Sequence, residues 1–197
     1  MSEITNTKSP LTTNVRAATR VSFLDRLSAR FGVIGKRCYH EYLDARRAGA
    51  SHPEVLEAHA KGINLWGYAD ARRVGASHPE VLEAHAKGID VCLYAFAREV
   101  GASHPEVLEA HAKGIDVGWY GEARRLASHA EALEAHAKGI NVWRYAVARR
   151  DDATHPEVLD AHAKGVNLDR YATVRYHNGD MSHERALEVC LKGILWW

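Results

Sequence analysis

A 13-residue segment that recurs along the chain constrains its fold more than any other feature. The segment Ser-His-Pro-Glu-Val-Leu-Glu-Ala-His-Ala-Lys-Gly-Ile occupies residues 51–63. Five further copies follow it, the last of them divergent. The six copies begin at intervals of 26, 26, 25, 26 and 28 residues, at Ser51, Ser77, Ser103, Ser128, Thr154 and Ser182. A fixed period of this size is typical of stacked-repeat proteins, in which each unit buries its apolar face against its neighbours.

Each copy predicts two short helices joined as a hairpin. Ser51 and Glu54 match a capping box, although either Ser51 or His52 can be the cap, because a residue before proline avoids the α region. Gly62 predicts the end of the first helix. Asn64, which is Asn or Asp in the later full copies, predicts the N-cap of a second helix that runs to about the next glycine.

The spacing of apolar residues predicts which side of each helix is packed. On the first helix, one side carries Val55, Leu56, His59, Ala60 and Ile63. On the second helix, the residues that recur from copy to copy are Leu65, Tyr68, Ala69 and Arg72. Two marginal helices per unit gain their stability by stacking. We therefore expect an all-α fold, an α-solenoid of stacked antiparallel hairpins with about 13 short helices.

The period also divides the chain. We expect a flexible leader at 1–21, a divergent capping hairpin at 22–50, five hairpin repeats at 51–76, 77–102, 103–127, 128–153 and 154–181, and a half repeat or cap at 182–197. Ser22 and Asp25 form the capping-box-like start of the divergent hairpin. The leader is either a targeting or secretion address or an ordinary terminus. The bulky residues Leu195–Trp197 either fold back as a cap or form a contact for self-association or a partner.

Charge and cysteine content exclude some classes of function. The chain has 26 Lys and Arg residues against 25 Asp and Glu, so no overall field favours nucleic acid or an anionic membrane. Three cysteines at unrelated spacings argue against a disulfide framework and fit a reducing, cytoplasmic setting. No apolar run approaches the ~20 residues needed to cross a bilayer, so we expect no membrane partner.

Three positions of each second helix vary from copy to copy. In the first full copy they are Trp66, Gly67 and Asp70, opposite the packed face. Their equivalents are Cys92, Leu93, Phe96, Gly118, Trp119, Glu122, Trp143, Arg144, Val147, Asp169, Arg170 and Thr173, with His40, Glu41 and Asp44 in the divergent copy. Free drift should leave small and charged residues, yet aromatic side chains gather here. These positions predict a protein-binding surface; drift or additional packing is the alternative.

Rows of lysine and arginine offer a second interpretation, a nucleic-acid-binding repeat protein. Each lysine of the Lys61 type follows an acid by four residues, a spacing that supplies ~0.2–0.5 kcal/mol of helix support. Each arginine of the Arg72 type lies near a helix C-terminus, where it can bond free carbonyls or an acid of the adjoining helix. We therefore expect a protein partner rather than nucleic acid. A structural, self-assembling component is the third alternative.

The histidines do not predict a metal or catalytic site. Eleven of the 13 fall at two repeat positions, the His52 type and the His59 type. These lie two helical turns apart, ~10.5 Å, which is too far to hold one ion. We expect the His59 type to fill the seam between repeats as a neutral, buried residue. No nucleophile–base arrangement or phosphate-binding glycine loop is evident, so we expect no enzyme activity, cofactor or metal.

The amino-acid sequence of the repeat resembles that of short repeats in uncharacterised bacterial and phage proteins. The resemblance rests on Gly-Ala-Ser-His-Pro-Glu-Val-Leu-Glu-Ala-His-Ala-Lys-Gly-Ile followed by Tyr-Ala-x-Ala-Arg, and covers about residues 38–194. It implies no known activity. At a coarser level the chain is similar to HEAT and TPR arrays, with a shorter unit, and those families imply a binding scaffold.

Overall fold

The computed structural model describes residues 22–23, 26–27, 32, 34–36, 38–177 and 181–193. Twelve helices are bounded within these residues: α2 Tyr39–Arg47, α3 His52–Ala60, α4 Leu65–Arg73, α5 His78–Ala86, α6 Val91–Glu99, α7 His104–Ala112, α8 Val117–Arg124, α9 His129–Ala137, α10 Val142–Arg150, α11 His155–Ala163, α12 Leu168–His177 and α13 His183–Leu191. The predicted leader 1–21, the cap residue Asp25 and the terminal contact Leu195–Trp197 lie outside the described residues.

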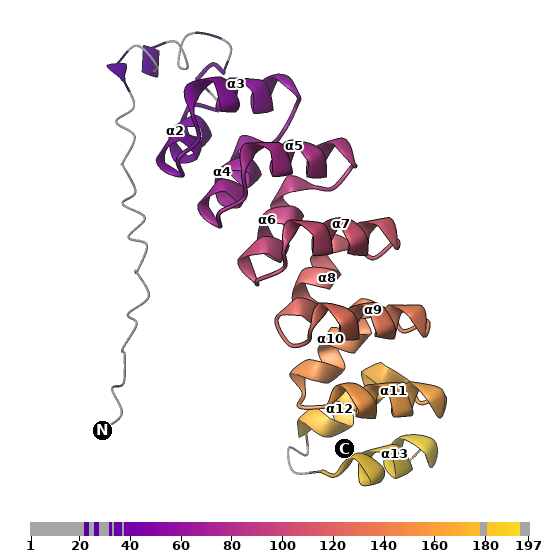
Figure 1. Ribbon diagram of the computed structural model, residues 1–197. Coiled ribbons are helices and arrows are strands. Elements are labelled where there is room, and N and C mark those ends of the chain that lie inside the picture. The colour runs from indigo at the N-terminus through magenta and orange to yellow at the C-terminus, as the bar shows by residue number, and fades with distance from the viewer. Residues whose placement is uncertain are drawn as a thin grey trace, which may run out of the picture.

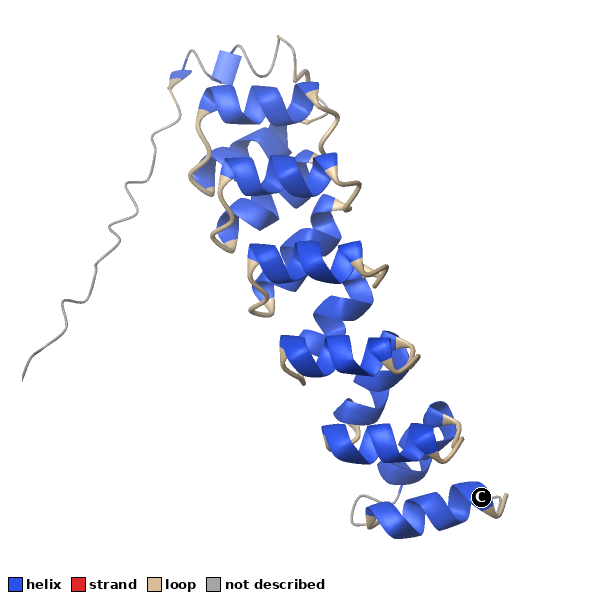
Figure 2. Cartoon of the chain, turned by 45° about the vertical axis from the view of Figure 1, so that its right-hand side comes forward, coloured by secondary structure: helices blue, strands red, loops and turns tan. Residues whose placement is uncertain are grey.

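The helices form an elongated stack of antiparallel hairpins, which confirms the predicted all-α solenoid (Figure 1). One layer, here called the first-helix layer, contains α3, α5, α7, α9, α11 and α13. The other, the second-helix layer, contains α2, α4, α6, α8, α10 and α12. No strand occurs among the described residues (Figure 2). The closest packing joins each second helix to the next, so the second-helix layer is the more tightly packed of the two.

The first helices begin at capping boxes. The Ser51 N–H donates to Glu54 Oε2 at 2.6 Å, and the Glu54 N–H donates to Ser51 Oγ at 3.3 Å. The same box recurs at Ser77, Ser103 and Ser128. Ser51 is therefore the cap and His52 the first helical residue. Both bonds satisfy backbone or side-chain groups that the start of a helix otherwise leaves unpaired.

Glycine ends the first helices, as predicted. Gly62 has a φ of 76°, a left-handed conformation that costs little in a residue without a Cβ. The Gly62 N–H donates to His59 O and the Ile63 N–H donates to Ala58 O, both at 3.0 Å. These two bonds form a Schellman motif, which reverses the chain toward the second helix.

The second helices begin at the predicted Asn and Asp caps. Asn64 Oδ1 accepts from the Trp66 N–H at 2.9 Å and from the Gly67 N–H at 3.2 Å. α2, α4 and α6 also end at a left-handed glycine, α8 is followed by Leu126 and Ala127 without one, and after α10 the left-handed position is held by Asp152, with a φ of 60°. The caps place the first two variable positions of each second helix in its first turn.

The packed side of the first helix differs from the prediction. Val55 and Ala58 are fully buried, whereas Leu56 and His59 are half-buried and Ala60 is exposed. The buried stripe of the helix therefore runs at i and i+3, and Ile63, just beyond the helix, is buried as predicted. His59 and Ala60 fall at the edge of that stripe instead of inside it.

The packed side of the second helix follows the prediction more closely. Leu65, Tyr68 and Ala69 are buried, and Arg72 is half-buried. Ala71 is also fully buried, because α4 has a neighbour of the same layer on each side, α2 and α6. Within the described part of the chain, no helix combines the length and apolar character needed to cross a membrane.

Candidate interaction surface

A tyrosine, a histidine and a carboxylate join consecutive repeats behind the variable surface. The Tyr94 hydroxyl lies 3.0 Å from His104 Nδ1, and His104 Nε2 lies 3.3 Å from Glu83 Oε2. In the tautomer with its hydrogen on Nε2, the ring donates to the carboxylate and its Nδ1 accepts from the tyrosine hydroxyl. Equivalent triads are Tyr68–His78–Glu57, Tyr120–His129–Glu109, Tyr145–His155–Glu134 and Tyr171–His183–Asp160. Each histidine is thus bonded to two residues of the preceding repeat.

These triads correct the predicted roles of the two histidine rows. The more deeply buried row is the His52 type: His78, His104 and His155 are buried, while His52, His129 and His183 are half-buried. The His59 type does lie at the seam, but it is half-buried: His85 Nε2 lies 3.1 Å from the Lys61 carbonyl oxygen of the preceding repeat. Its ring lies at the helix edge, so one side remains in contact with solvent. No group of histidine, cysteine and acidic residues in the described part of the chain is arranged to hold a metal ion.

Burial of the triad tyrosines changes their acidity. Each tyrosine ring of this row is fully buried. Burial raises the pKa of Tyr94, Tyr145 and Tyr171 to about 12, and it raises the pKa of Tyr68 and Tyr120 further. Because the charged phenolate is disfavoured inside the stack, each hydroxyl remains a neutral hydrogen-bonding group at neutral pH.

The arginine row points inward, as its position near the helix C-termini predicts. Arg72 donates to the Ala76 carbonyl at 3.2 Å, and Arg149 donates to the Leu126 carbonyl of the preceding repeat at 2.8 Å. Arg98 instead donates to Glu80 Oε1 at 3.2 Å. Arginines of this row keep only 12–18% of their side-chain surface exposed. The arginines of this row are therefore engaged in contacts inside the helical stack.

The lysine row is paired with acids one turn earlier, as predicted. Lys61 Nζ lies 3.7 Å from Glu57 Oε1, while the other oxygen of Glu57 bonds His78. The pairing recurs at Lys87, Lys113, Lys138, Lys164 and Lys192. About half of each lysine side chain is exposed, so these contacts are surface ion pairs of small energy.

The variable positions lie on the second-helix layer, and several of them expose large apolar side chains. Trp66, Trp119, Trp143 and Leu93 are all exposed. Phe96, Asp70, Glu122, Val147 and Arg170 are half-buried, as is Cys92, whereas Arg144 and Asp169 are exposed. Gly67 departs from the expected exposed surface: it is buried, because α6 approaches it closely.

Variable residues of consecutive repeats meet in what we call junction pairs. A junction pair joins the second variable position of one repeat to the first variable position of the next. Trp119 and Trp143 form one such pair, with ring centroids 4.5 Å apart and planes tilted by 45°. Arg144 and Asp169 form the next, with Nε and Oδ2 separated by 3.0 Å. Aromatic meets aromatic at one junction, and a cation meets a carboxylate at the other.

Two further junction pairs match a glycine with a larger residue. A Cβ on Gly67 would lie 2.7 Å from Cys92 Sγ, and a Cβ on Gly118 would lie 3.3 Å from Leu93 Cδ2. A related match joins Phe96, at the third variable position of its repeat, to Gly121 of the next repeat, which stands at the position of Ala69. A Cβ on Gly121 would lie 2.7 Å from the Phe96 ring. Each glycine leaves the volume that the neighbouring side chain fills. The predicted alternative of additional packing is therefore realised in part, alongside the exposed aromatic surface.

A groove of about 390 Å³ lies between α4 and α6 on the variable surface. Its lining includes Trp66, Asp70 and Arg73 of α4 and Cys92, Phe96 and Glu99 of α6. Asp70 and Arg73 form an ion pair along one side. Burial raises the pKa of the Cys92 thiol, and the carboxylates of Asp90 and Asp70 raise it further. The thiol therefore remains neutral at neutral pH.

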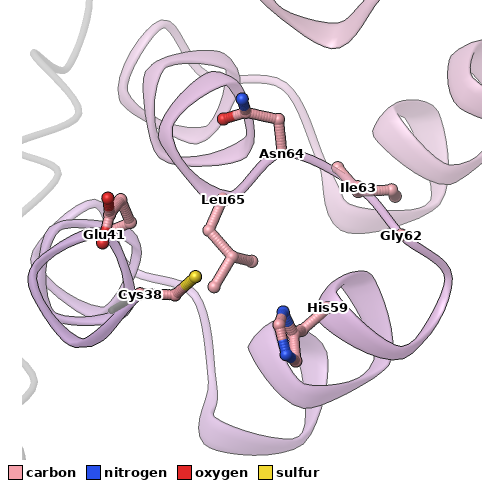
Figure 3. A pocket seen from close by; sticks show the side chains of 7 residues that line it. All are labelled: Cys38, Glu41, His59, Gly62, Ile63, Asn64 and Leu65. Carbon is pink, nitrogen blue, oxygen red and sulfur yellow. The ribbon is translucent and has the colours of Figure 1, made fainter. Parts of the chain in front are cut away.

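A second hollow, of about 300 Å³, lies at the N-terminal end of the stack (Figure 3). Figure 3 shows Cys38 beside Leu65, with His59 approaching from α3 and Glu41 from α2. The other lining residues, Gly62, Ile63 and Asn64, belong to the constant connection between helices. This hollow is therefore separate from the exposed aromatic part of the variable surface.

Sequence reasoning located the variable surface but missed the triads and the junction pairs. The signal for the triads was present, because tyrosine precedes the histidine by ten residues in most copies. The junction pairs required knowing which variable position of one helix faces which position of the next.

No protein-family model, curated protein or solved structure matches the chain.

Proposed function

We propose that this chain is a non-enzymatic protein-interaction module that binds a partner through the variable surface of its second-helix layer. The observation that carries the proposal is the exposure of three large aromatic side chains on the second-helix layer. Trp66 is 59% exposed, Trp119 44% and Trp143 39%. Tryptophan is enriched among residues that dominate binding energy, and clustered exposed aromatics favour an interaction site over random drift.

The contact between Trp119 and Trp143 supports the proposal further. Each indole restricts the other, and yet both keep a large exposed area. A side chain already held in place loses less conformational entropy when it is covered by a partner. The two rings therefore offer a preformed apolar platform at the junction of α8 and α10.

The bonding of the basic residues supports a protein partner over a nucleic acid. The arginine row donates to carbonyls and carboxylates inside the frame, and the lysine row is paired with acids. Nucleic-acid binding depends on cations that are free to neutralise phosphates. The mixed aromatic and charged variable surface is closer to the composition of protein interfaces.

We also propose a cytoplasmic setting and an origin among bacterial or phage repeat proteins. The first rests on three free cysteines, Cys38, Cys92 and Cys190, which fit a reducing compartment. The proposed origin rests only on the resemblance of the repeat sequence to short repeats in bacterial and phage proteins.

The test is capture of a binding partner from the native host with a triple variant, W66A/W119A/W143A. We expect capture to be lost, because the variant removes the exposed aromatic area without touching the triads. A matched triple variant in the first-helix layer, K61A/K87A/K113A, should retain capture. Circular dichroism melts should show that both variants remain folded.

Capture that survives the tryptophan substitutions would sink the proposal. The two alternatives have their own readouts. A steep salt dependence of filter-bound DNA or RNA would indicate a nucleic-acid-binding protein. Light scattering that reports growing particles for the purified chain would indicate a self-assembling component.

A further inference from the structure

Building on the proposed function, we infer that the groove between α4 and α6 receives an arginine side chain from an extended segment of the partner protein. The groove differs from the rest of the second-helix layer in its charge pattern. On α2, α4 and α8, a surface acid is paired with an arginine three residues later: Asp44 with Arg47, Asp70 with Arg73, and Glu122 with Arg125. On α6 the same two positions hold Phe96 and Glu99.

The change on α6 leaves an excess carboxylate at the groove. Glu99 is exposed and forms no ion pair with any other described residue. Asp70 lines the α4 side of the groove, and Asp90, outside the lining, interacts with Cys92. Arg73 is the one cation of the lining, and it is already engaged by Asp70. The groove is therefore complementary to a positively charged group.

The aromatic lining specifies the kind of cation. Trp66 presents its exposed indole on the α4 side, and Phe96 presents its ring on the α6 side, held against Gly121. A cation over an aromatic face is stabilised by the ring quadrupole, most strongly over tryptophan. Guanidinium stacks on such faces and forms a planar fork with a carboxylate, whereas ammonium is a strongly hydrated point charge. Arginine fits this lining better than lysine.

The surroundings of the groove indicate that the arginine comes from a peptide segment. Leu93, in the first turn of α6, and Trp119 of the next repeat are both exposed apolar side chains of the same layer. An extended segment with apolar residues beside its arginine would cover them while the guanidinium enters the groove. Helical arrays offer such continuous surfaces to extended partners.

The test uses two synthetic nonapeptides, Gly-Ser-Gly-Leu-Arg-Leu-Gly-Ser-Gly and the same peptide with citrulline in place of arginine. Citrulline keeps the shape of the side chain and removes its charge. Titrations of the full chain are followed by NMR at the Trp66 indole. We expect the citrulline peptide to bind about tenfold more weakly, since a cation–aromatic contact and an exposed ion pair are lost together.

A variant taken from the chain's own pattern sharpens the test. Glu99→Arg introduces the residue that stands at this position on α4, α8 and α10. It should weaken binding of the arginine peptide about tenfold and leave the citrulline peptide within about twofold. Glu184→Arg makes the same charge change on α13, far from the groove, and should alter neither. The double variant F96D/E99R, which rebuilds the acid–arginine pair of α4, should behave as Glu99→Arg does.

Equal binding of the two peptides, including no measurable binding of either, overturns the arginine inference. An unchanged affinity of the Glu99→Arg variant also overturns it. These results are independent of partner capture by the tryptophan variant. If capture is lost in W66A/W119A/W143A while the two peptides bind alike, the proposed function stands and the arginine inference fails. If capture survives in that variant, the proposed function itself fails.

Discussion

The two layers of the stack differ in how strictly their residues repeat from unit to unit. In the first-helix layer, α3, α5 and α7 have the same nine residues, and each later helix of the array offers a histidine to the repeat before it. In the second-helix layer, the variable positions differ at every junction, and yet their contacts are matched. Gly67 accommodates Cys92, Trp119 meets Trp143, and Arg144 meets Asp169.

This difference teaches how a repeated frame can tolerate variation. The five triads make the same kind of bonds at their junctions, so these contacts between repeats do not depend on the variable residues. Variation is then restricted only by the neighbour that each variable residue touches. A change in one repeat needs one compensating change in the next, as in Phe96 with Gly121. Residues that remain exposed after this matching are free to serve a partner.

The largest expected effect on stability is unfolding at alkaline pH, because deprotonation acts on the buried tyrosines of all five triads. The folded pKa of Tyr94, Tyr145 and Tyr171 is about 12, above the ordinary value of about 10. Stability from the neutral hydroxyls is therefore fully present below about pH 10 and is lost as pH rises through the folded pKa. Circular dichroism should show helix loss between these values, and full helicity persisting above them would contradict the role of burial.

The next effect removes one triad. Tyr94→Ala deletes a fully buried ring and leaves His104 Nδ1 without its partner. We expect the free energy of unfolding to fall by about 3–5 kcal/mol, the range for large aromatic truncations in cores. Urea denaturation measures it. Tyr145→Ala should cost a similar amount, because the layer makes the same contacts there; a difference of several kcal/mol would show that junctions are not equivalent.

The matched variation of the second-helix layer is tested by a double-mutant cycle. Gly121→Ala should cost about 1–3 kcal/mol, because the new methyl group meets the Phe96 ring. With Phe96→Ala in place, the same change should become favourable by up to about 1 kcal/mol, since alanine exceeds glycine in helix propensity. The other four repeats already hold alanine at this position, as Ala69, Ala95, Ala146 and Ala172. Additive effects in urea unfolding would mean that the two residues are not coupled.

The smallest expected effect concerns the charged junction pair. Arg144→Asp places two carboxylates at the α10–α12 junction and should cost no more than about 1 kcal/mol, because both side chains are about half exposed. The swap R144D/D169R should recover most of that loss at low salt. Unfolding of both variants with added salt provides the control, since screening should shrink the difference.

The sequence specified most of the local structure because the signals for it are local. Caps at Ser51 and Asn64, the glycine ends and the pairing of Lys61 with Glu57 depend on residues within a turn of one another. These predictions are confirmed. The inward bonding of the Arg72 row also followed from its place near a helix end.

Contacts between repeats were harder to predict, because they depend on the offset between neighbouring helices. The sequence showed that His52 and His59 recur, but not which of them lies inside, and the assignment of the buried role to His59 was wrong. Gly67 was placed on the open surface although α6 covers it. Trp66, Leu93, Trp119 and Trp143 are exposed at the variable positions, and their role in binding a partner stays a prediction.

Because the residues of each junction pair match one another, the repeats pack well only in their present order. Removing residues 103–127 would set Leu93 against Trp143, where a glycine now leaves room for it. Duplicating the same unit would set Trp119 over a second copy of Gly118 and leave an unfilled space. The units are therefore not interchangeable, and an array lengthened by a duplicated unit would need compensating substitutions at its new junction.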